Sequence, residues 1–156
     1  MLRLQHIIGI VIVLIIAVWA IHQVVTHNGG GGAASAEAAS SYQQGKTAYL
    51  SGNAAQGLTL AEQAIAKDPT QADYFNLAAM CCYKRDDIQG GVQYVQKAIS
   101  LNPNEAKYWE NLGRGLLELQ KLPEAKQAFE KALACNNDPA RKAEIDQIMQ
   151  TAGMAK

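Results

Sequence analysis

Small residues recur at intervals of 34 positions between residues 38 and 139, and this period constrains the fold more than any other feature of the chain. In the copy that starts at residue 106, the eighth, twentieth and twenty-seventh places hold Gly113, Ala125 and Ala132. The same places of the two preceding copies hold Ala79, Gly91 and Ala98, and Gly45, Gly57 and Ala64. Only Gly or Ala lets two helix backbones approach to the ~8–10 Å of a tight pair. The period therefore predicts repeated pairs of antiparallel helices.

Larger residues and turn signals agree with three units, over 38–71, 72–105 and 106–139. Phe75, Trp109 and Phe129 stand at places from which a side chain can fill the space between neighbouring units. The pairs Asp68-Pro69 and Asn102-Pro103 close one unit and open the next. Asp and Asn favour helix starts, and proline is tolerated in the first helical turn.

A further helix is predicted over 140–152, after Asp138-Pro139. Its apolar residues fall roughly on one face, which would cover the open end of the stack as terminal caps do in solenoids. They are Ala143, Ile145, Ile148, Met149 and Ala152.

The pattern resembles the tetratricopeptide repeat (TPR) family, and the third unit matches it best. The residues that carry the resemblance there are Trp109, Leu112, Gly113, Leu116, Ala125, Phe129 and Ala132. The first unit matches worst, since Ser41 replaces the usual aromatic residue. The resemblance implies an all-α solenoid of three helix-turn-helix units, stacked as a right-handed superhelix and closed by the C-terminal capping helix.

The first 25 residues are expected to anchor the chain in a lipid bilayer. Ile7–Val25 contains no Asp, Glu, Lys or Arg, and a helix of this length spans ~28 Å, close to the hydrocarbon thickness of a membrane. Arg3 is the one charged side chain before this transmembrane helix, so the positive-inside rule places the N-terminus in the cytoplasm. We therefore expect a single-pass protein, in a bacterial inner membrane, with its repeats in the periplasm. A cleaved signal peptide is the alternative, since Ala34-Ser35-Ala36 matches a cleavage site.

Residues 26–37 read THNGGGGAASAE and predict a flexible Gly/Ala/Ser linker between the anchor and the repeats.

Composition argues against several functions. Fourteen basic residues balance fourteen acidic ones, so the chain lacks the one-signed field that nucleic-acid binding usually requires. Histidines occur only at positions 6, 22 and 27, which leaves the repeats without one. Cys81, Cys82 and Cys135 show no metal-ligand spacing and are expected to be small core residues. We therefore expect no catalytic residue, no metal and no cofactor, and a protein that is not an enzyme.

The resemblance implies that the first helix of each unit lines a concave groove that binds partner proteins. Carried onto this chain, its groove places give the candidate partner-binding residues Tyr42, Lys46, Tyr49, Asn76, Met80, Tyr83, Lys84, Lys107, Asn111 and Arg114. Tyrosines offer rigid contact area, and the amides can bond a peptide backbone. Some family members clamp a C-terminal carboxylate, but of the five residues that such a clamp uses, only Lys107 is matched here.

The expected function is that of a membrane-tethered scaffold or assembly adaptor, which binds a peptide or helix in the groove. One alternative is a structural subunit of a larger membrane complex, such as secretion, pilus or envelope machinery, held mainly through its transmembrane helix. A second is a cytosol-facing receptor on an organelle membrane, which would suit the free cysteines. The sequence leaves open the partner and whether the array forms a homo-oligomer.

Overall fold

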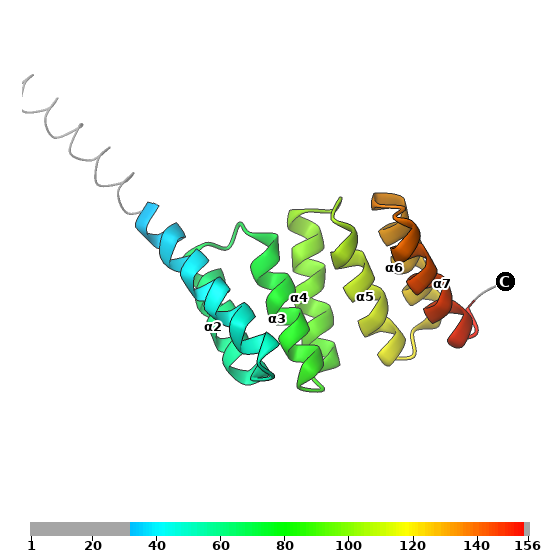
Figure 1. Cartoon of the computed structure of the whole chain (residues 1–156), viewed down its shortest axis with the longest axis horizontal. Coiled ribbons are helices and arrows are strands. Elements are labelled where there is room, and N and C mark those ends of the chain that lie inside the picture. The colour runs from blue at the N-terminus through cyan, green and yellow to red at the C-terminus, as the bar shows by residue number, and fades with distance from the viewer. Residues whose placement is uncertain (1–31, 155–156) are drawn as a thin grey trace, which may run out of the picture. The chain divides into compact units, whose positions relative to one another are not determined.

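Antiparallel helix pairs make up the part of the chain that the computed structural model describes, residues 32–154 (Figure 1). The first helix covers residues 32–50. It is followed by α2 (Ala54–Lys67), α3 (Ala72–Lys84), α4 (Ile88–Leu101), α5 (Ala106–Glu118), α6 (Leu122–Cys135) and α7 (Pro139–Thr151). From residue 37 onwards the helices belong to one compact unit. The prediction of an all-α solenoid is confirmed for this part of the chain.

The helix crossings are tight, as the 34-residue period predicts. A Cβ atom added to Gly113 of α5 would lie 2.7 Å from the ring of Phe129 in α6. One added to Gly45 of the first helix would lie 3.1 Å from Leu77 of α3 and 3.3 Å from the backbone oxygen of Gly57 in α2. Such distances leave no room for a larger residue at Gly113 without movement of its neighbour.

The turn inside each unit uses the same backbone geometry. Gly52, Asp86 and Gln120 stand 34 residues apart and all have positive φ angles, of 89°, 65° and 58°. The next N–H group in each turn closes a Schellman-type bond back into the preceding helix. These bonds run from Asn53 to Ala48 (2.9 Å), from Asp87 to Cys82 (3.0 Å) and from Lys121 to Leu116 (2.9 Å). Asn53 and Asp87 then cap α2 and α4 by accepting the backbone N–H groups of Gln56 and Gly90.

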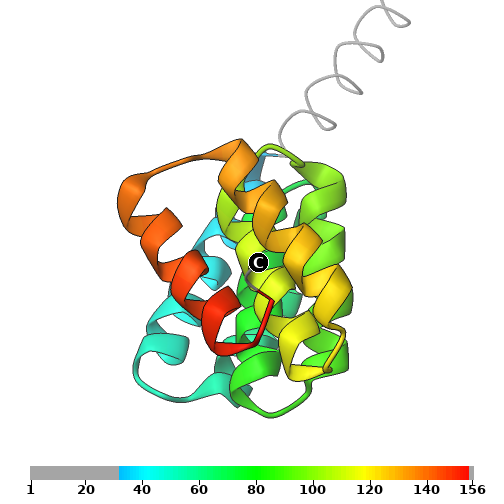
Figure 2. The ribbon, with the colours of Figure 1, turned by 90° about the vertical axis from the view of Figure 1, so that its right-hand side faces the viewer.

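The C-terminal helix covers the end of the stack, where Figure 2 looks directly onto it. Ile145 of α7 is fully buried, and Met154, just beyond the helix, is nearly so. Ile148, Met149 and Ala152 are partly buried against the same core. Ala143 differs from the expectation, since it is exposed to solvent. The apolar face of α7 is therefore narrower than its sequence suggests.

The expected linker over 26–37 must be corrected at its second half. The structure is helical from residue 32, so residues 32–37 extend the first helix instead of forming a flexible tether. This stretch is rich in Ala, the strongest helix former, which outweighs the expectation drawn from its small residues. The rest of the linker and the anchor Ile7–Val25 lie outside the described residues, so these remain predictions. Within 32–154, no helix is both long and apolar enough to cross a bilayer.

Candidate functional site

Five of the predicted binding residues line one pocket between the first helix and α3. We call it the N-terminal pocket; its volume is about 140 Å³. Its lining comprises Tyr42, Lys46, Tyr49, Leu50, Asp73, Asn76, Leu77 and Met80. Leu50 is 77% exposed, which is unusual for a large apolar side chain and leaves apolar surface open at the pocket's edge. The face of the first helix, α3 and α5 that carries these side chains is called the groove face below.

Two cations on this part of the groove face have no carboxylate partner within 32–154. The Lys46 ammonium lies 5.4 Å from the centre of the Tyr42 ring. The Lys84 ammonium lies 4.7 Å from the centre of the Tyr49 ring and 3.4 Å from the Tyr49 carbonyl oxygen. These are cation–π contacts of exposed groups, which leave the positive charge available to a ligand. The N-terminal pocket therefore combines apolar surface with Lys46, which forms no ion pair within 32–154, and Lys84 lies beside it at Tyr49.

Lys107 is engaged within the array. Its ammonium lies 2.8 Å from the carboxylate of Asp73, and the Tyr108 hydroxyl donates to the same oxygen at 2.7 Å. Burial alone would raise the pKa of Asp73, but the hydrogen bonds from Lys107 and Tyr108 and the nearby positive charges lower it overall. The charge that the sequence assigned to a ligand thus already has a partner on α3.

Asn76 and Asn111 bond each other across the groove face. The amide of Asn111 donates to the side-chain oxygen of Asn76 at 2.8 Å, and the amide of Asn76 points to the sulfur of Met80 at 3.6 Å. Asn76 is buried. The Asn76 side chain thus ties α3 to α5, and its contact with a partner peptide stays a prediction.

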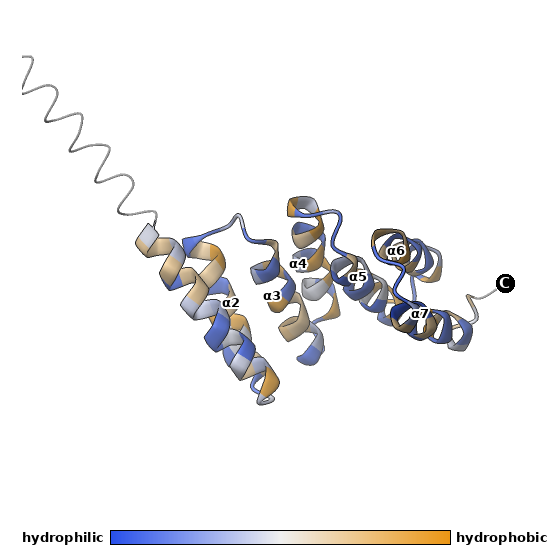
Figure 3. Ribbon diagram, turned by 45° about the horizontal axis from the view of Figure 1, so that its top comes forward, coloured by the Kyte–Doolittle hydropathy of each residue, from blue (hydrophilic) through white to orange (hydrophobic). Residues whose placement is uncertain are grey.

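Arg114 is held between two helices. Its guanidinium lies 3.1 Å from Glu110 on its own helix and 2.6 Å from Glu144 on α7. Arg141 of α7 approaches the second oxygen of Glu110 at 3.5 Å. Figure 3 shows that hydrophilic residues colour much of α5 and α7, in agreement with this network. Arg114 thus positions the capping helix, a role that the sequence pattern did not suggest.

The hydroxyl end of Tyr83 is turned inward, while the residue still lines a pocket of the groove face, so its contact with a partner stays a prediction. A Cβ atom added to Gly91 of α4 or to Gly115 of α5 would come closer than 3.0 Å to the tyrosine side chain. The aromatic ring therefore fills a slot that two glycines create between α4 and α5. Burial raises the pKa of Tyr83 well above its ordinary value. Its hydroxyl is buried without a hydrogen-bond partner among the described residues.

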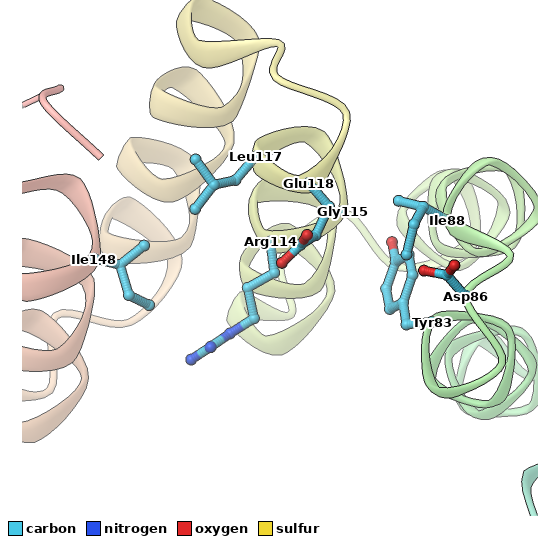
Figure 4. A pocket seen from close by; sticks show the side chains of 8 residues that line it. All are labelled: Tyr83, Asp86, Ile88, Arg114, Gly115, Leu117, Glu118 and Ile148. Carbon is cyan, nitrogen blue, oxygen red and sulfur yellow. The ribbon is translucent and has the colours of Figure 1, made fainter. Parts of the chain in front are cut away.

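A second hollow, the C-terminal pocket, lies where the end of α3, the start of α4, α5 and α7 meet (Figure 4). Its volume is about 460 Å³. Its lining comprises Tyr83, Asp86, Ile88, Arg114, Gly115, Leu117, Glu118 and Ile148. Most of these are absent from the residues that the sequence pattern singled out. Glu118 could have been found, because it occupies the same place of its unit as Lys84, as does Leu50 of the N-terminal pocket.

The three cysteines are free thiols, with Cys81 and Cys82 buried and Cys135 partly exposed. Burial raises the pKa of Cys81 and of Cys82 to about 11, so both are protonated and unreactive near neutral pH. No group of three or more His, Cys, Asp or Glu residues in the described part of the chain could hold a metal ion.

Comparison with known proteins places this geometry in a family. Two models described as "Tetratricopeptide repeat" match residues 42–106 and 106–139, which together span more than half of the chain. Three solved structures illustrate the shared fold. The first TPR domain of Spaghetti (RPAP3), bound to the HSP90 peptide SRMEEVD, has a TM-score of 0.70 at 21% sequence identity and covers 76% of this chain and 98% of that chain.

The second TPR domain of Spaghetti, bound to the same peptide, has a TM-score of 0.63 at 26% identity and covers 64% of this chain and 93% of that chain. The OM64 TPR domain of Arabidopsis has a TM-score of 0.70 at 18% identity, with 76% and 98% covered. The family matches and the helix pairs agree in position with the 34-residue period. Through its residues 42–139, the chain belongs to the tetratricopeptide repeat family.

Proposed function

We propose that this protein is a membrane-tethered interaction module, a scaffold or assembly adaptor, that binds a peptide or helix of a partner protein on its groove face. The N-terminal pocket carries the proposal. It offers exposed apolar surface at Leu50 beside the ammonium group of Lys46, and Lys84 lies next to the pocket at Tyr49; neither lysine forms an ion pair within residues 32–154. Apolar surface flanked by unpaired charge is typical of peptide-binding sites.

The solved relatives support a peptide as the ligand, since both TPR domains of Spaghetti are bound to an HSP90 peptide. Only Lys107 matches a carboxylate clamp, and Asp73 already pairs with it. We therefore assign recognition to the N-terminal pocket and to contacts along the segment, and not to capture of a chain terminus at Lys107.

The tether is proposed to be Ile7–Val25, which would hold the repeats at the periplasmic face of a bacterial inner membrane. The uncharged length of this run and the single preceding charge, Arg3, support this arrangement. A tether would restrict the array to partners at the same membrane and raise their effective concentration.

A photo-crosslinking amino acid in place of Leu50, in the full-length chain and in native membranes, tests the function. We expect a specific cross-linked protein, which is lost when Lys46→Glu is added. The same crosslinker in place of Gln93, an exposed residue of α4, serves as the control. Equal capture of the same proteins from both positions would contradict binding at the groove face.

A second variant tests the tether. An unrelated apolar helix replaces Ile7–Val25, and we expect cross-linking at position 50 to survive the replacement. Loss of the partner would instead favour a structural subunit that is held by its transmembrane helix.

A further inference from the structure

The C-terminal pocket has the form of a side-chain receptor. Ile88, Leu117 and Ile148 contribute apolar walls from three different helices, and the cavity of about 460 Å³ lies in the size range of ligand pockets, ~300–1,000 Å³. Figure 4 shows Leu117 and Ile148 on one side of the cavity and Tyr83 with Ile88 on the other. An extended side chain with an apolar stem fits such walls.

Two carboxylates in this pocket have no partner. Asp86 and Glu118 are exposed, and neither forms an ion pair or a hydrogen bond from its side chain to any residue of 32–154. The other carboxylates on this face, Asp73, Glu110 and Glu144, are each held by a Lys or Arg. The pocket thus differs from its surroundings by an uncompensated negative charge.

The one cation that lines the pocket does not neutralise these groups. The guanidinium of Arg114 is bound to Glu110 and Glu144. In Figure 4 its side chain extends away from Asp86. Both carboxylates are therefore free to accept a positive group from a bound ligand.

The ring of Tyr83 also belongs to the pocket wall. Tyr83 lines the cavity, and its hydroxyl is buried without a partner among the described residues. The hydroxyl itself packs at Gly115, so the ring of Tyr83, and not its polar group, contributes to the wall of the cavity.

We infer that the C-terminal pocket receives a lysine or arginine side chain of the partner segment, which rests on the proposed function of the groove face. The aliphatic stem lies against Ile88, Leu117 and Ile148, and the cationic head group lies between Asp86 and Glu118. At the other end of the groove face, Lys46 of the N-terminal pocket and the neighbouring Lys84 carry the opposite charge. A segment with a basic residue towards α7 and acidic or apolar residues towards the first helix is therefore bound in one direction only.

A random library of twelve-residue peptides, selected on the full-length protein in detergent micelles, tests the inference. We expect the selected peptides to share one Lys or Arg. The double variant Asp86→Asn/Glu118→Gln should weaken binding of such a peptide about tenfold, as should replacement of the peptide's basic residue by Gln. Asn suits position 86, because it tolerates a positive φ angle better than most residues.

The matched control is Glu124→Gln/Glu130→Gln on α6, where both residues are exposed and the net charge changes by the same amount. It should leave binding unchanged. Charge reversal by Glu118→Lys should shift the selection towards peptides with Asp or Glu at the same position, which loss of folding cannot imitate.

Three results would overturn the inference. The first is a set of selected peptides without a shared basic residue, and the second is equal binding by the Asp86→Asn/Glu118→Gln variant and the control. Either result would refute the inference. The proposed function would stand in both cases if Lys46→Glu still weakens binding. A wild-type protein that selects no peptide would refute both.

Discussion

The interface between the first and second units differs from that between the second and third, although the same small-residue period generates both. The buried residues of the first are mostly small or medium in size, namely Ala61, Leu77, Ala78 and Cys81 in one cluster and Ala38, Ala64 and Tyr74 in a smaller one. Tyrosine rings, among them Tyr42, are only partly buried against them. The second belongs to a larger cluster that continues through the third unit to α7, and Phe129 of α6 is fully buried in that cluster. Larger members of that cluster are Phe75, Val92, Val95, Tyr108, Leu112, Leu116 and Ile145. The period sets where helices cross, whereas the side chains between them set how much apolar area is buried.

The largest expected effect is at Phe129. Phe129→Ala should lower the free energy of unfolding by about 3–5 kcal/mol, because it leaves a cavity in the larger cluster, where its ring packs against Gly113 of α5. Cys81→Ala, which removes one buried atom from the first interface, should cost about 1 kcal/mol. Urea denaturation followed by circular dichroism measures both, with the exposed Glu130→Ala as control. Similar losses at positions 81 and 129 would break the comparison.

Two glycines at the eighth position of their units, Gly45 and Gly113, sharpen the comparison of the two regions. Gly113→Ala should destabilise the protein by about 1–3 kcal/mol, because the new methyl group would lie 2.7 Å from the packed ring of Phe129. Gly45→Ala should be close to neutral. Its nearest neighbour, the terminal methyl of Leu77 at 3.1 Å, can move. Leu60 at 3.2 Å and the backbone oxygen of Gly57 at 3.3 Å must also shift slightly, and the gain of about 1 kcal/mol in helix propensity offsets that cost. Thermal melting of the two variants measures this difference. A larger loss of stability for Gly45→Ala than for Gly113→Ala would contradict the packing described.

The turns give an effect of opposite sign in the two regions. Gln120→Gly should stabilise the third unit by about 0.5–1 kcal/mol, since Gln120 holds a φ angle of 58° that glycine adopts without strain. Gly52→Ala should destabilise the first unit by about 1 kcal/mol, because its φ angle is 89°. Midpoints of urea unfolding provide the measurement. Stabilisation by both substitutions would show that the backbone angles are not those described.

The smallest expected effect is on the stability of the protein at acidic pH. Asp73 accepts from Tyr108 across the second interface, whereas the equivalent Tyr74 at the first packs its ring 5.0 Å from that of Tyr42. The folded-state pKa of Asp73 is lowered, so its contribution to stability is present above the unfolded-state pKa of ~3.9 and is lost as pH falls through the folded value. Asp73→Asn should flatten the loss of stability below about pH 4 by less than ~1 kcal/mol, since Asp73 is almost half exposed. Stability curves against pH, with Asp146→Asn as control, measure this difference.

Much of the fold was predictable, because it depends on positions at which residue size decides. Gly113 and Gly45 revealed helix crossings through their spacing alone, and Asp138-Pro139 marked the start of α7. Residues 32–37 were misjudged, because a run of Ala and Ser is compatible with both a linker and a helix. For these residues the neighbouring helix decides, which a local reading of composition does not include.

The candidate site was less predictable, because its residues are defined by their partners. The position within the repeat predicts that Tyr83, Asn76 and Arg114 lie on the groove face, but it does not predict the direction of their side chains. Tyr83 enters the array because Gly91 and Gly115 make room for it, and Arg114 is held by Glu144 from a helix thirty residues later. That Asp86 and Glu118 form no ion pair could be known only from the structure, because the sequence does not show which charged side chains lie close together.

The slot that holds Tyr83 implies that three positions of this chain can only change together. A larger residue at 91 or 115 would need a smaller one at 83, and the third unit already shows such a combination, with Leu117 in place of the tyrosine and Ala125 in place of the glycine. Anyone who redesigns this array for a new ligand by grafting single residues onto the groove should therefore transfer 83, 91 and 115 as a set. In a collection of homologous sequences, the same constraint would produce correlated substitutions between position 83 on the groove face and positions 91 and 115, where helices pack together.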